Sequence, residues 1–203
     1  MNALLLIDLQ NDFLPTGPLP VPEGDRVIPI ANRLMPRFQH VIASQDWHPA
    51  NHGSFAANHP GKKPGDLITL AGLPQILWPT HCVQNTPGAE LAPTLDRARI
   101  SHLLQKGTDP QIDSYSAFFD NGHLKATALH DYLRTQNITH LYLLGLATDY
   151  CVKFSAKDAR QLGYQVHLVS DACRGVNLRP NDVAAALEEM KSAGVQIIRS
   201  EQI

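Results

Sequence analysis

The segment ITHLYLLGLATDYCVKFSAKDARQL, residues 138–162, has the pattern of a buried strand that leads directly into a helix. Its first part, Ile138–Leu146, is almost continuously apolar, which is typical of a strand buried on both faces of a parallel sheet. Its second part, Tyr150–Leu162, has apolar residues at helical spacing. Because parallel strands need crossover connections, which are usually helices, the segment predicts an α/β domain.

The same alternation extends over the whole chain. Five further strands are predicted at short apolar runs: Ala3–Leu9, Phe38–Ser44, Ile100–Gln105, Tyr164–Ser170 and Val195–Ile198. Three further helices are predicted by helical periodicity: Asp25–Leu34, His123–Thr135 and Asn181–Ser192. We therefore expect a single domain over residues 1–203, with a three-layer α/β/α architecture and right-handed crossovers. Pro15–Gly24 and Pro49–Pro79 follow neither period and are predicted to be long loops.

Composition excludes several classes of protein. With 203 residues, 43% hydrophobic and 18% charged, the chain can fill a core, which argues against disorder. Its 17 basic and 19 acidic residues leave a formal charge of −2, so a nucleic-acid-binding protein is not expected. The longest uninterrupted apolar run, Ala3–Ile7, is far shorter than the about 20 residues of a membrane helix, and no basic segment precedes it. We expect a soluble, cytoplasmic protein that binds neither nucleic acid nor membrane.

Chemically useful side chains follow four of the predicted strands. Asp8 ends the first strand, Asp46 and His48 follow the second, Lys106 ends the third, and Cys151 follows the fourth. Ligands of open parallel sheets bind at the carboxyl ends of the strands, so these side chains are expected to converge. A carboxylate, an ammonium group and a thiol together provide a base, a positive charge and a nucleophile.

The three cysteines are not equivalent as candidate nucleophiles. They are odd in number and contain no Cys-x-x-Cys pair, so neither a disulfide framework nor a thiolate zinc site is expected. Cys151 precedes a predicted helix, whose N-terminus favours the thiolate. Cys173 follows the strand Tyr164–Ser170 and remains an alternative, whereas Cys82 has the pattern of a packing residue.

A second candidate cluster is a metal site. Asp46 and His48 are two residues apart, so both side chains point the same way on an extended chain. His81 would complete a set of two histidines and one carboxylate, which suits Zn2+ or Fe2+ and leaves positions open. The chain has ten histidines, so chance proximity is the competing interpretation. Alternative or additional ligands are His52, His59 and Ser54.

Five motifs together resemble a known family. They are Asp8–Phe13 (DLQNDF), Asp46–His48 (DWH), Trp78–Gln84 (WPTHCVQ), Lys106-Gly107 and Gly145–Cys151 (GLATDYC). In order and spacing, over almost the whole chain, they resemble the nicotinamidases of the isochorismatase-like hydrolases. The first and last motifs mark the superfamily, whereas DWH and WPTHC narrow the resemblance to nicotinamidases.

The resemblance implies a fold, an activity and a set of site residues. It implies a six-stranded parallel sheet flanked by helices and an amidohydrolase that converts nicotinamide to nicotinate and ammonia in NAD salvage, and that also acts on pyrazinamide. The implied triad is Cys151, Asp8 and Lys106, with Cys151 forming a thioester. The implied ligands of one divalent metal, Zn2+ or Fe2+ with Mn2+ as an alternative, are Asp46, His48 and His81. Some relatives have a fourth ligand eight residues after the aspartate, but Ser54 occupies that position here.

Further features follow from the same resemblance. It implies a cis peptide at Leu146–Ala147 and an oxyanion hole formed by the N–H groups of Ala147 and Cys151. The implied aromatic pocket for the pyridine ring consists of Phe13, Trp78 and Tyr115. The expected assembly is a monomer or a small homo-oligomer.

Other functions are also compatible with parts of this sequence. Carbamoyl-amide and other small-amide hydrolases of the superfamily share the triad but generally lack the Asp-Trp-His motif. A non-catalytic binding protein could use the same fold. A nucleotide-binding oxidoreductase would need Gly-x-Gly-x-x-Gly after its first strand, where this chain has Asp8–Asp12.

Overall fold

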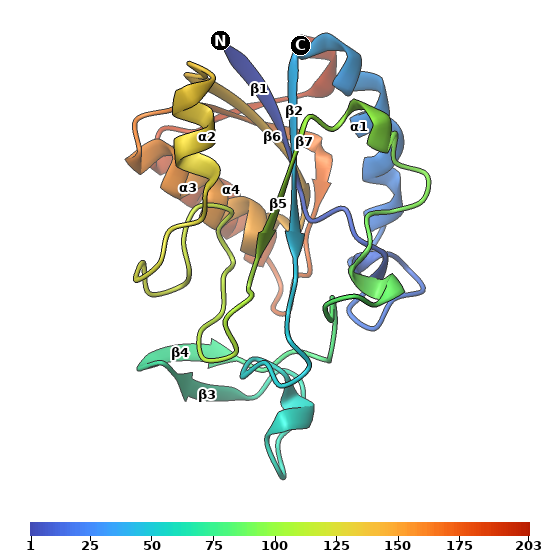
Figure 1. Ribbon diagram of the computed structural model, residues 1–203, viewed down its shortest axis with the longest axis vertical. Coiled ribbons are helices and arrows are strands. Elements are labelled where there is room, and N and C mark those ends of the chain that lie inside the picture. Colours follow the sequence, from blue (N-terminus) through green and yellow to red (C-terminus); the bar gives the residue numbers. More distant parts are fainter.

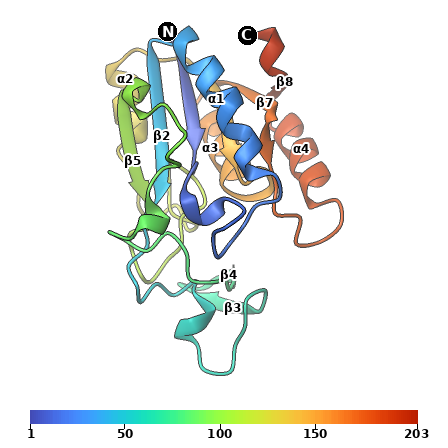
Figure 2. The ribbon, with the colours of Figure 1, turned by 90° about the vertical axis from the view of Figure 1, so that its right-hand side faces the viewer.

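Six parallel strands form the central sheet of the computed structural model, which describes residues 1–203. The spatial order is β5-β2-β1-β6-β7-β8 (Figures 1 and 2). The strands are β1 (Asn2–Ile7), β2 (His40–Asp46), β5 (His102–Lys106), β6 (His140–Leu146), β7 (Gln165–Arg174) and β8 (Gln196–Ile198). The six predicted strands and the predicted fold class are therefore confirmed, with boundaries shifted by a few residues.

The helices cover both faces of this sheet. They are α1 (Val27–Leu34), α2 (Leu129–Thr135), α3 (Lys153–Gln161) and α4 (Asp182–Ser192). Figure 1 shows α1 on one side of the sheet and the other three helices on the opposite side. The helices lie on different faces because of the strand order. From β1 the chain adds β2 on one side, whereas from β6 it adds β7 and β8 on the opposite side, and right-handed crossovers then place their helices on opposite faces. A sheet of this kind has its ligand crevice at that switch point, beyond the carboxyl ends of β1 and β6.

The core explains why the strands are continuously apolar. Ala3–Ile7 of β1 have no exposed surface, since β1 lies between β2 and β6 and has packed layers on both faces. An apolar side chain buried in this way contributes about 1.5–3 kcal/mol through removal from water. No helix in the structure has the length and apolar character that crossing a membrane requires.

The predicted helix over His123–Thr135 is wrong in its first half. The helix α2 begins only at Leu129, and His123 has a φ of 53°, outside the right-handed helical region. The carboxylate of Asp120 accepts hydrogen bonds from the N–H groups of Gly122, Leu124 and Lys125. These local bonds stabilise a turn in place of the first helical turn.

The predicted loop Pro49–Pro79 contains an unexpected hairpin. Its strands are β3 (Leu67–Leu70) and β4 (Leu73–Ile76), which pair antiparallel beyond the carboxyl edge of the main sheet (Figure 1). Four-residue strands leave little room for alternation, and Pro74 within β4 is unfavourable for a strand prediction. The first turn after β6 is also irregular, since Thr148–Val152 forms a π-turn before α3 begins.

One glycine is required where β6 approaches β1. Gly145 has a φ of 131°, and a Cβ atom there would lie 2.2 Å from the carbonyl oxygen of Ile7.

We expect Gly145→Ala to lower the free energy of unfolding by at least about 3 kcal/mol, from strain and overlap together. Gly163→Ala is the matched control: Gly163 has a φ of 93° but no atom within 4 Å of the added Cβ. This control should cost only about 1–2 kcal/mol in urea unfolding, and equal losses would contradict the argument.

Candidate active site

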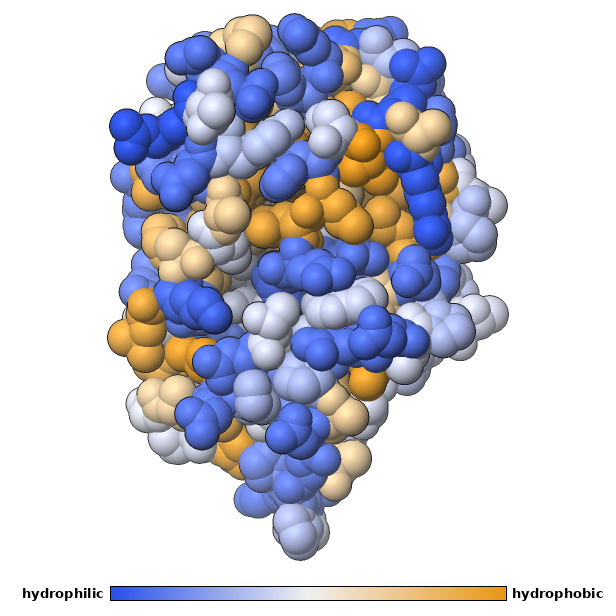
Figure 3. Space-filling view, viewed as in Figure 1, coloured by the Kyte–Doolittle hydropathy of each residue, from blue (hydrophilic) through white to orange (hydrophobic).

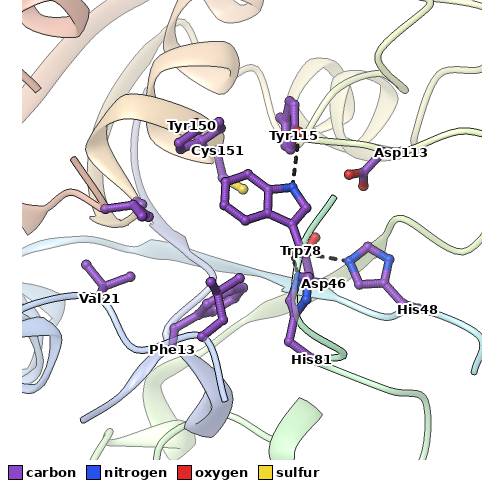
Figure 4. A pocket seen from close by; sticks show the side chains of 13 residues that line it. Phe13, Val21, Asp46, His48, Trp78, His81, Asp113, Tyr115, Tyr150 and Cys151 are labelled. Atoms are coloured by element: carbon purple, nitrogen blue, oxygen red, sulfur yellow. Dashed lines mark hydrogen bonds and ion pairs between the residues drawn. The ribbon is translucent and has the colours of Figure 1, made fainter. Parts of the chain in front are cut away.

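A cavity of about 410 Å³ opens at the carboxyl ends of the central strands. Figure 4 shows the sulfur of Cys151 at its inner side, with the indole of Trp78 in front of it and Phe13 nearby. Nine of its 13 lining residues are hydrophobic, and the polar ones include Asp46, His48 and His81. A largely apolar cavity with a few convergent polar groups is the usual form of a small-molecule site.

The ammonium group of Lys106 lies at the centre of the polar side chains. Its Nζ is 2.9 Å from Oδ2 of Asp8, 2.5 Å from Oδ1 of Asp46 and 3.4 Å from Sγ of Cys151. It also donates a hydrogen bond of 3.0 Å to the carbonyl of Ser114. The structure thus brings together the three side chains predicted to form a triad.

The strand register explains this convergence. Asp46 and Lys106 are the last residues of β2 and β5 and are direct partners across that strand pair. Their side chains therefore point to the same face of the sheet. Asp8 follows β1, and the hydroxyl of Ser44 donates a 2.6 Å hydrogen bond to its Oδ1. Cys151 comes from the π-turn after β6, the neighbour of β1 on the other side.

Burial and neighbouring charges shift the titration of these groups. Burial raises the pKa of Asp8, and the Lys106 charge offsets only part of that effect. Burial also favours neutral Asp46, but Lys106 and His48 outweigh it and hold the pKa of Asp46 well below its ordinary value. For Lys106, the two carboxylates outweigh burial and raise the pKa, so the side chain stays charged.

The prediction that the helix N-terminus favours a thiolate at Cys151 is not met. Burial raises the pKa of the Cys151 thiol, although Lys106 acts in the opposite direction. The resting side chain is therefore a neutral thiol that needs a base. The carboxylate of Asp8 and the sulfur of Cys151 lie within 4.8 Å of each other, so Asp8 is placed for that task.

The other cysteines lie outside this cluster. Cys173 is inside β7, which extends to Arg174, and its Sγ contacts the carbonyl of Val169 at 3.4 Å. Burial raises the pKa of Cys173 to about 12. Cys82 is completely buried within the core cluster, as the packing interpretation predicts. The geometry therefore favours Cys151 over Cys173 as the candidate nucleophile.

Asp46, His48 and His81 form a buried set whose possible ligand atoms lie within 4.8 Å of one another. The Nε2 atoms of His48 and His81 are 3.6 Å and 4.0 Å from Oδ2 of Asp46. Each Nδ1 bonds to a backbone carbonyl, that of Gly107 for His48 and that of Pro79 for His81. This arrangement leaves both Nε2 atoms directed at the carboxylate, as in histidines that ligate metals.

The protonation of the two histidines also suits a metal site. Burial and the charge of His48 lower the pKa of His81 to about 4, so its Nε2 has a free lone pair at neutral pH. For His48, burial disfavours the charged form, but the Asp46 carboxylate outweighs it and raises the pKa. A divalent cation would replace that proton as the partner of Asp46. The donor set therefore fits a divalent metal ion.

His52 and Ser54, two of the alternative metal ligands considered from the sequence, lie beside His48. The ring of His52 is 4.3 Å from that of His48, and its Nδ1 is 2.7 Å from the hydroxyl of Ser54. A second group of close donor atoms consists of His48, His52 and Asp113. His59 instead bonds to the carbonyl of Gly53.

Aromatic side chains form the outer wall of the cavity. Phe13, Trp78 and Tyr115 all line it, and the Trp78 Nε1–H donates a 3.2 Å hydrogen bond to the Tyr115 hydroxyl. Tyr150, which the sequence analysis missed, lies edge-on to Trp78 at 4.9 Å between ring centroids. Its position directly before Cys151 was the available signal.

The irregular turn after β6 contributes the remaining wall. The peptide bond between Leu146 and Ala147 is cis, as the resemblance implies, and Ala147 lines the cavity. The carboxylate of Asp149 accepts hydrogen bonds from the N–H groups of Val176 and Asn177. Asp149 thereby holds Val176, another lining residue, in place.

Gln10 was also missed as a site residue. Its side-chain amide bonds to both backbone groups of Asp46: Nε2 donates to the carbonyl, and Oε1 accepts from the N–H, each at 2.8 Å. Nε2 also donates to the carbonyl of Ala89. Gln10 therefore fixes the end of β2 that carries Asp46, and its signal was its place within the DLQNDF motif.

Comparisons with known proteins agree with this geometry. Residues 2–202 match the isochorismatase domain family. A nicotinamidase of Escherichia coli is 55% identical over 200 residues, which cover 97% of this chain and 93% of that protein. A structure of an Acinetobacter baumanii nicotinamidase and pyrazinamidase has a TM-score of 0.96 at 42% identity, covering 99% of this chain and 97% of that chain. A Pyrococcus horikoshii pyrazinamidase solved in complex with zinc has a TM-score of 0.79 at 39% identity, covering 98% of each chain.

The protein therefore belongs to the isochorismatase family, whose fold and domain it shares over almost its full length. Within that family it groups with the nicotinamidases.

Removal of the buried ammonium group provides a test of the electrostatic arrangement. Lys106→Met leaves two buried carboxylates without a cation, so we expect a loss of about 3–5 kcal/mol in the free energy of unfolding at pH 8 with a chelator present. Lys106 lowers the pKa of both carboxyl groups, so without it the folded state of the variant binds more protons than the folded wild type does. The loss of stability relative to the wild type should therefore become smaller as the pH falls from 8 to 5.

The matched control is Lys62→Met, because Lys62 is exposed. Its unfolding free energy should change little at either pH. A loss in Lys106→Met that stays constant between pH 5 and 8 would contradict the proposed pairing.

Proposed function

We propose that the protein is a nicotinamidase, an amidohydrolase that converts nicotinamide to nicotinate and ammonia and also accepts pyrazinamide. The observation that carries this proposal is the contact of one buried ammonium group, that of Lys106, with both Asp8 and Cys151 in an aromatic cavity. The identity of 55% to a nicotinamidase over almost the whole chain supports the same substrate. Nicotinate release would make this reaction a step of NAD salvage.

The first half of the reaction forms a thioester. Asp8 removes the proton of the Cys151 thiol, and the sulfur attacks the carboxamide carbon of the substrate. The N–H groups of Ala147 and Cys151 stabilise the negative charge that develops on the carboxamide oxygen, by an amount that can reach about 3 kcal/mol per donor. Protonated Asp8 then transfers its proton to the departing nitrogen, the C–N bond breaks and ammonia leaves.

The second half restores the enzyme. Asp8 removes a proton from a water molecule, which attacks the thioester carbon. The C–S bond breaks, nicotinate is released, and the Cys151 sulfur recovers a proton from Asp8. Throughout, the Lys106 ammonium stabilises whichever of Asp8 and Cys151 carries the negative charge, since it contacts both.

The remaining side chains bind and orient the substrate. Phe13, Trp78 and Tyr115 enclose a flat ring, which fits the apolar lining of the cavity. Asp46, His48 and His81 would hold one divalent ion, Zn2+ or Fe2+ with Mn2+ as an alternative, and the related pyrazinamidase with zinc supports this assignment. Such an ion, when bound, would supply a Lewis acid for the ring nitrogen. The protein would thereby hold the carboxamide at the sulfur.

Two other functions are less well supported. A carbamoyl-amide hydrolase would share the triad, but the buried Asp46, His48 and His81 set favours a substrate with a metal-binding ring nitrogen. A non-catalytic binding protein would have no need for a base, a buried cation and a thiol in mutual contact.

The nucleophile is tested by ammonia release from nicotinamide. We expect Cys151→Ala to reduce kcat by at least about a thousandfold, because no thioester can form. Cys173→Ala, the matched control, should retain activity close to that of the wild type. Loss of activity only in Cys173→Ala would overturn the assignment, and no release by the metal-loaded wild type would contradict the nicotinamidase proposal itself.

The metal site is tested by metal content. We expect the wild type to retain about one divalent ion per chain after dialysis and His81→Ala to retain far less, because one of three ligands is lost. His167→Ala removes a histidine of β7 outside the cluster and should leave the metal content unchanged. Mass spectrometry of the dialysed proteins measures both, and full occupancy in His81→Ala would exclude His81 as a ligand.

A further inference from the structure

The β3–β4 hairpin contributes one buried polar side chain to the site. The hairpin lies toward the lower end of the molecule in Figures 1 and 3, and its strand residues are exposed or half-buried, with Leu67 at 65% of its possible surface. Gln75 of β4 is the exception, since it is only 3% exposed. Gln75 pairs with Ile68 across the hairpin, and its side chain points away from solvent into the body of the protein. Neither the motifs nor the mechanism uses this residue.

The amide nitrogen of Gln75 connects two residues of the cavity wall. Nε2 donates hydrogen bonds to Oδ2 of Asp113 and to the hydroxyl of Tyr115, each at 3.1 Å. It also donates a 2.8 Å hydrogen bond to the carbonyl of Ile76, so its two N–H groups are shared among three acceptors. Asp113 and Tyr115 both line the cavity, so a residue of the hairpin holds two positions of its wall.

The hydroxyl of Tyr115 continues this connection to Trp78. It accepts hydrogen bonds from Gln75 Nε2 and from the Trp78 indole N–H at 3.2 Å. Two accepted bonds occupy both lone pairs of the oxygen, so the hydroxyl position is defined by both donors. The Tyr115 ring is further held by Tyr150, at 5.4 Å between centroids. Figure 4 shows this hydrogen bond between Trp78 and Tyr115 at the wall of the cavity that Cys151 also lines.

The side-chain amide of Gln75 also holds the carboxylate of Asp113. Its Oδ1 accepts a hydrogen bond from the N–H of Ser114, whereas Gln75 is the side-chain donor to its Oδ2. A buried carboxylate that loses a donor is strongly destabilised and tends to rotate toward another partner. Gln75 therefore keeps the Asp113 carboxylate at the wall, within 4.8 Å of the nearest ring nitrogen of His48.

We infer that Gln75 is a positioning residue for the aromatic substrate. Through Tyr115 it sets the orientation of Trp78, and through its hydrogen bond to Asp113 it holds that side chain in the wall of the cavity. This inference rests on the proposed function, because the ring that Trp78 contacts is that of the substrate. The amide is needed because its N–H groups donate to both wall residues, Asp113 and Tyr115. Glutamate at this position has no donor when ionised and would repel Asp113.

Trp78 and Tyr115 would contact the substrate ring, which does not react, equally well in the bound substrate and in the transition state. Their contribution is therefore uniform binding, which stabilises both states by the same amount. Loss of uniform binding raises KM and leaves kcat nearly unchanged. A general loss of folded protein would instead lower the apparent kcat and leave KM unchanged. The ratio of the two effects therefore separates positioning from a merely structural role.

The experiment compares Gln75→Leu and Gln75→Glu with the wild type in nicotinamide hydrolysis. We expect Gln75→Leu to raise KM by roughly three- to tenfold, the range of one to two lost hydrogen bonds, with kcat within about twofold. Gln75→Glu should raise KM further. Thr69→Ala is the matched control on the same hairpin, since Thr69 is exposed and lies opposite Pro74. An unchanged KM in both Gln75 variants would overturn the inference.

A double-mutant cycle with Tyr115→Phe tests the route of the effect. Tyr115→Phe removes the shared acceptor, so Gln75→Leu should raise KM by a smaller factor in that background than in the wild type. Equal factors in the two backgrounds would refute the connection through Tyr115. Nicotinamide binding to Cys151→Ala, measured by calorimetry with and without Gln75→Leu, should show the same three- to tenfold change without turnover.

These outcomes are distinguishable from failure of the proposed function. If the metal-loaded wild type releases no ammonia from nicotinamide, the proposed function fails. If the wild type is active but the Gln75 variants keep its KM and binding constant, only the inference about Gln75 fails.

Discussion

The ammonium group of Lys106 is the interaction on which the site depends. A buried charge costs several kcal/mol unless it is paired, and here two carboxylates, a carbonyl and a thiol surround it. The same contacts make Asp46 anionic and keep Lys106 charged. Asp8, with its raised pKa, is left as the group able to exchange a proton with Cys151. The electrostatics of the cluster therefore favour an ionised Asp46 and an Asp8 that takes up a proton more readily.

The sheet topology makes this cluster possible. Four strands that are adjacent in space, β5, β2, β1 and β6, end at the same edge, and a candidate site residue lies at or just beyond the end of each. Direct pairing of Asp46 with Lys106 places both side chains on one face, and the reversal of strand order between β1 and β6 opens the crevice beside them. The buried residues of β1 thus fix the position of Asp8, which follows directly at the carboxyl end of that strand.

The walls of the cavity come from irregular segments that are held by specific hydrogen bonds. Gln10 binds both backbone groups of Asp46, Asp149 holds the segment with Val176, and backbone carbonyls orient the rings of His48 and His81. Loops of this length would otherwise be mobile, and a site that must align a ring with a sulfur needs groups that are held in place. This requirement explains why so many polar side chains around the cavity bond to backbone atoms.

The sequence by itself determined the six strands of the main sheet, the order of the candidate site residues and the family, because apolar runs and motifs are local patterns. Asp8, Lys106 and Cys151 could be predicted to converge, since parallel strands bring their carboxyl ends to one edge. Only the tertiary structure decided that α2 begins at Leu129, that burial raises the pKa of the Cys151 thiol, and that Gln75 reaches Tyr115 across 40 positions of the chain. These features depend on burial and on hydrogen bonds between distant segments, and no periodicity of the chain encodes either.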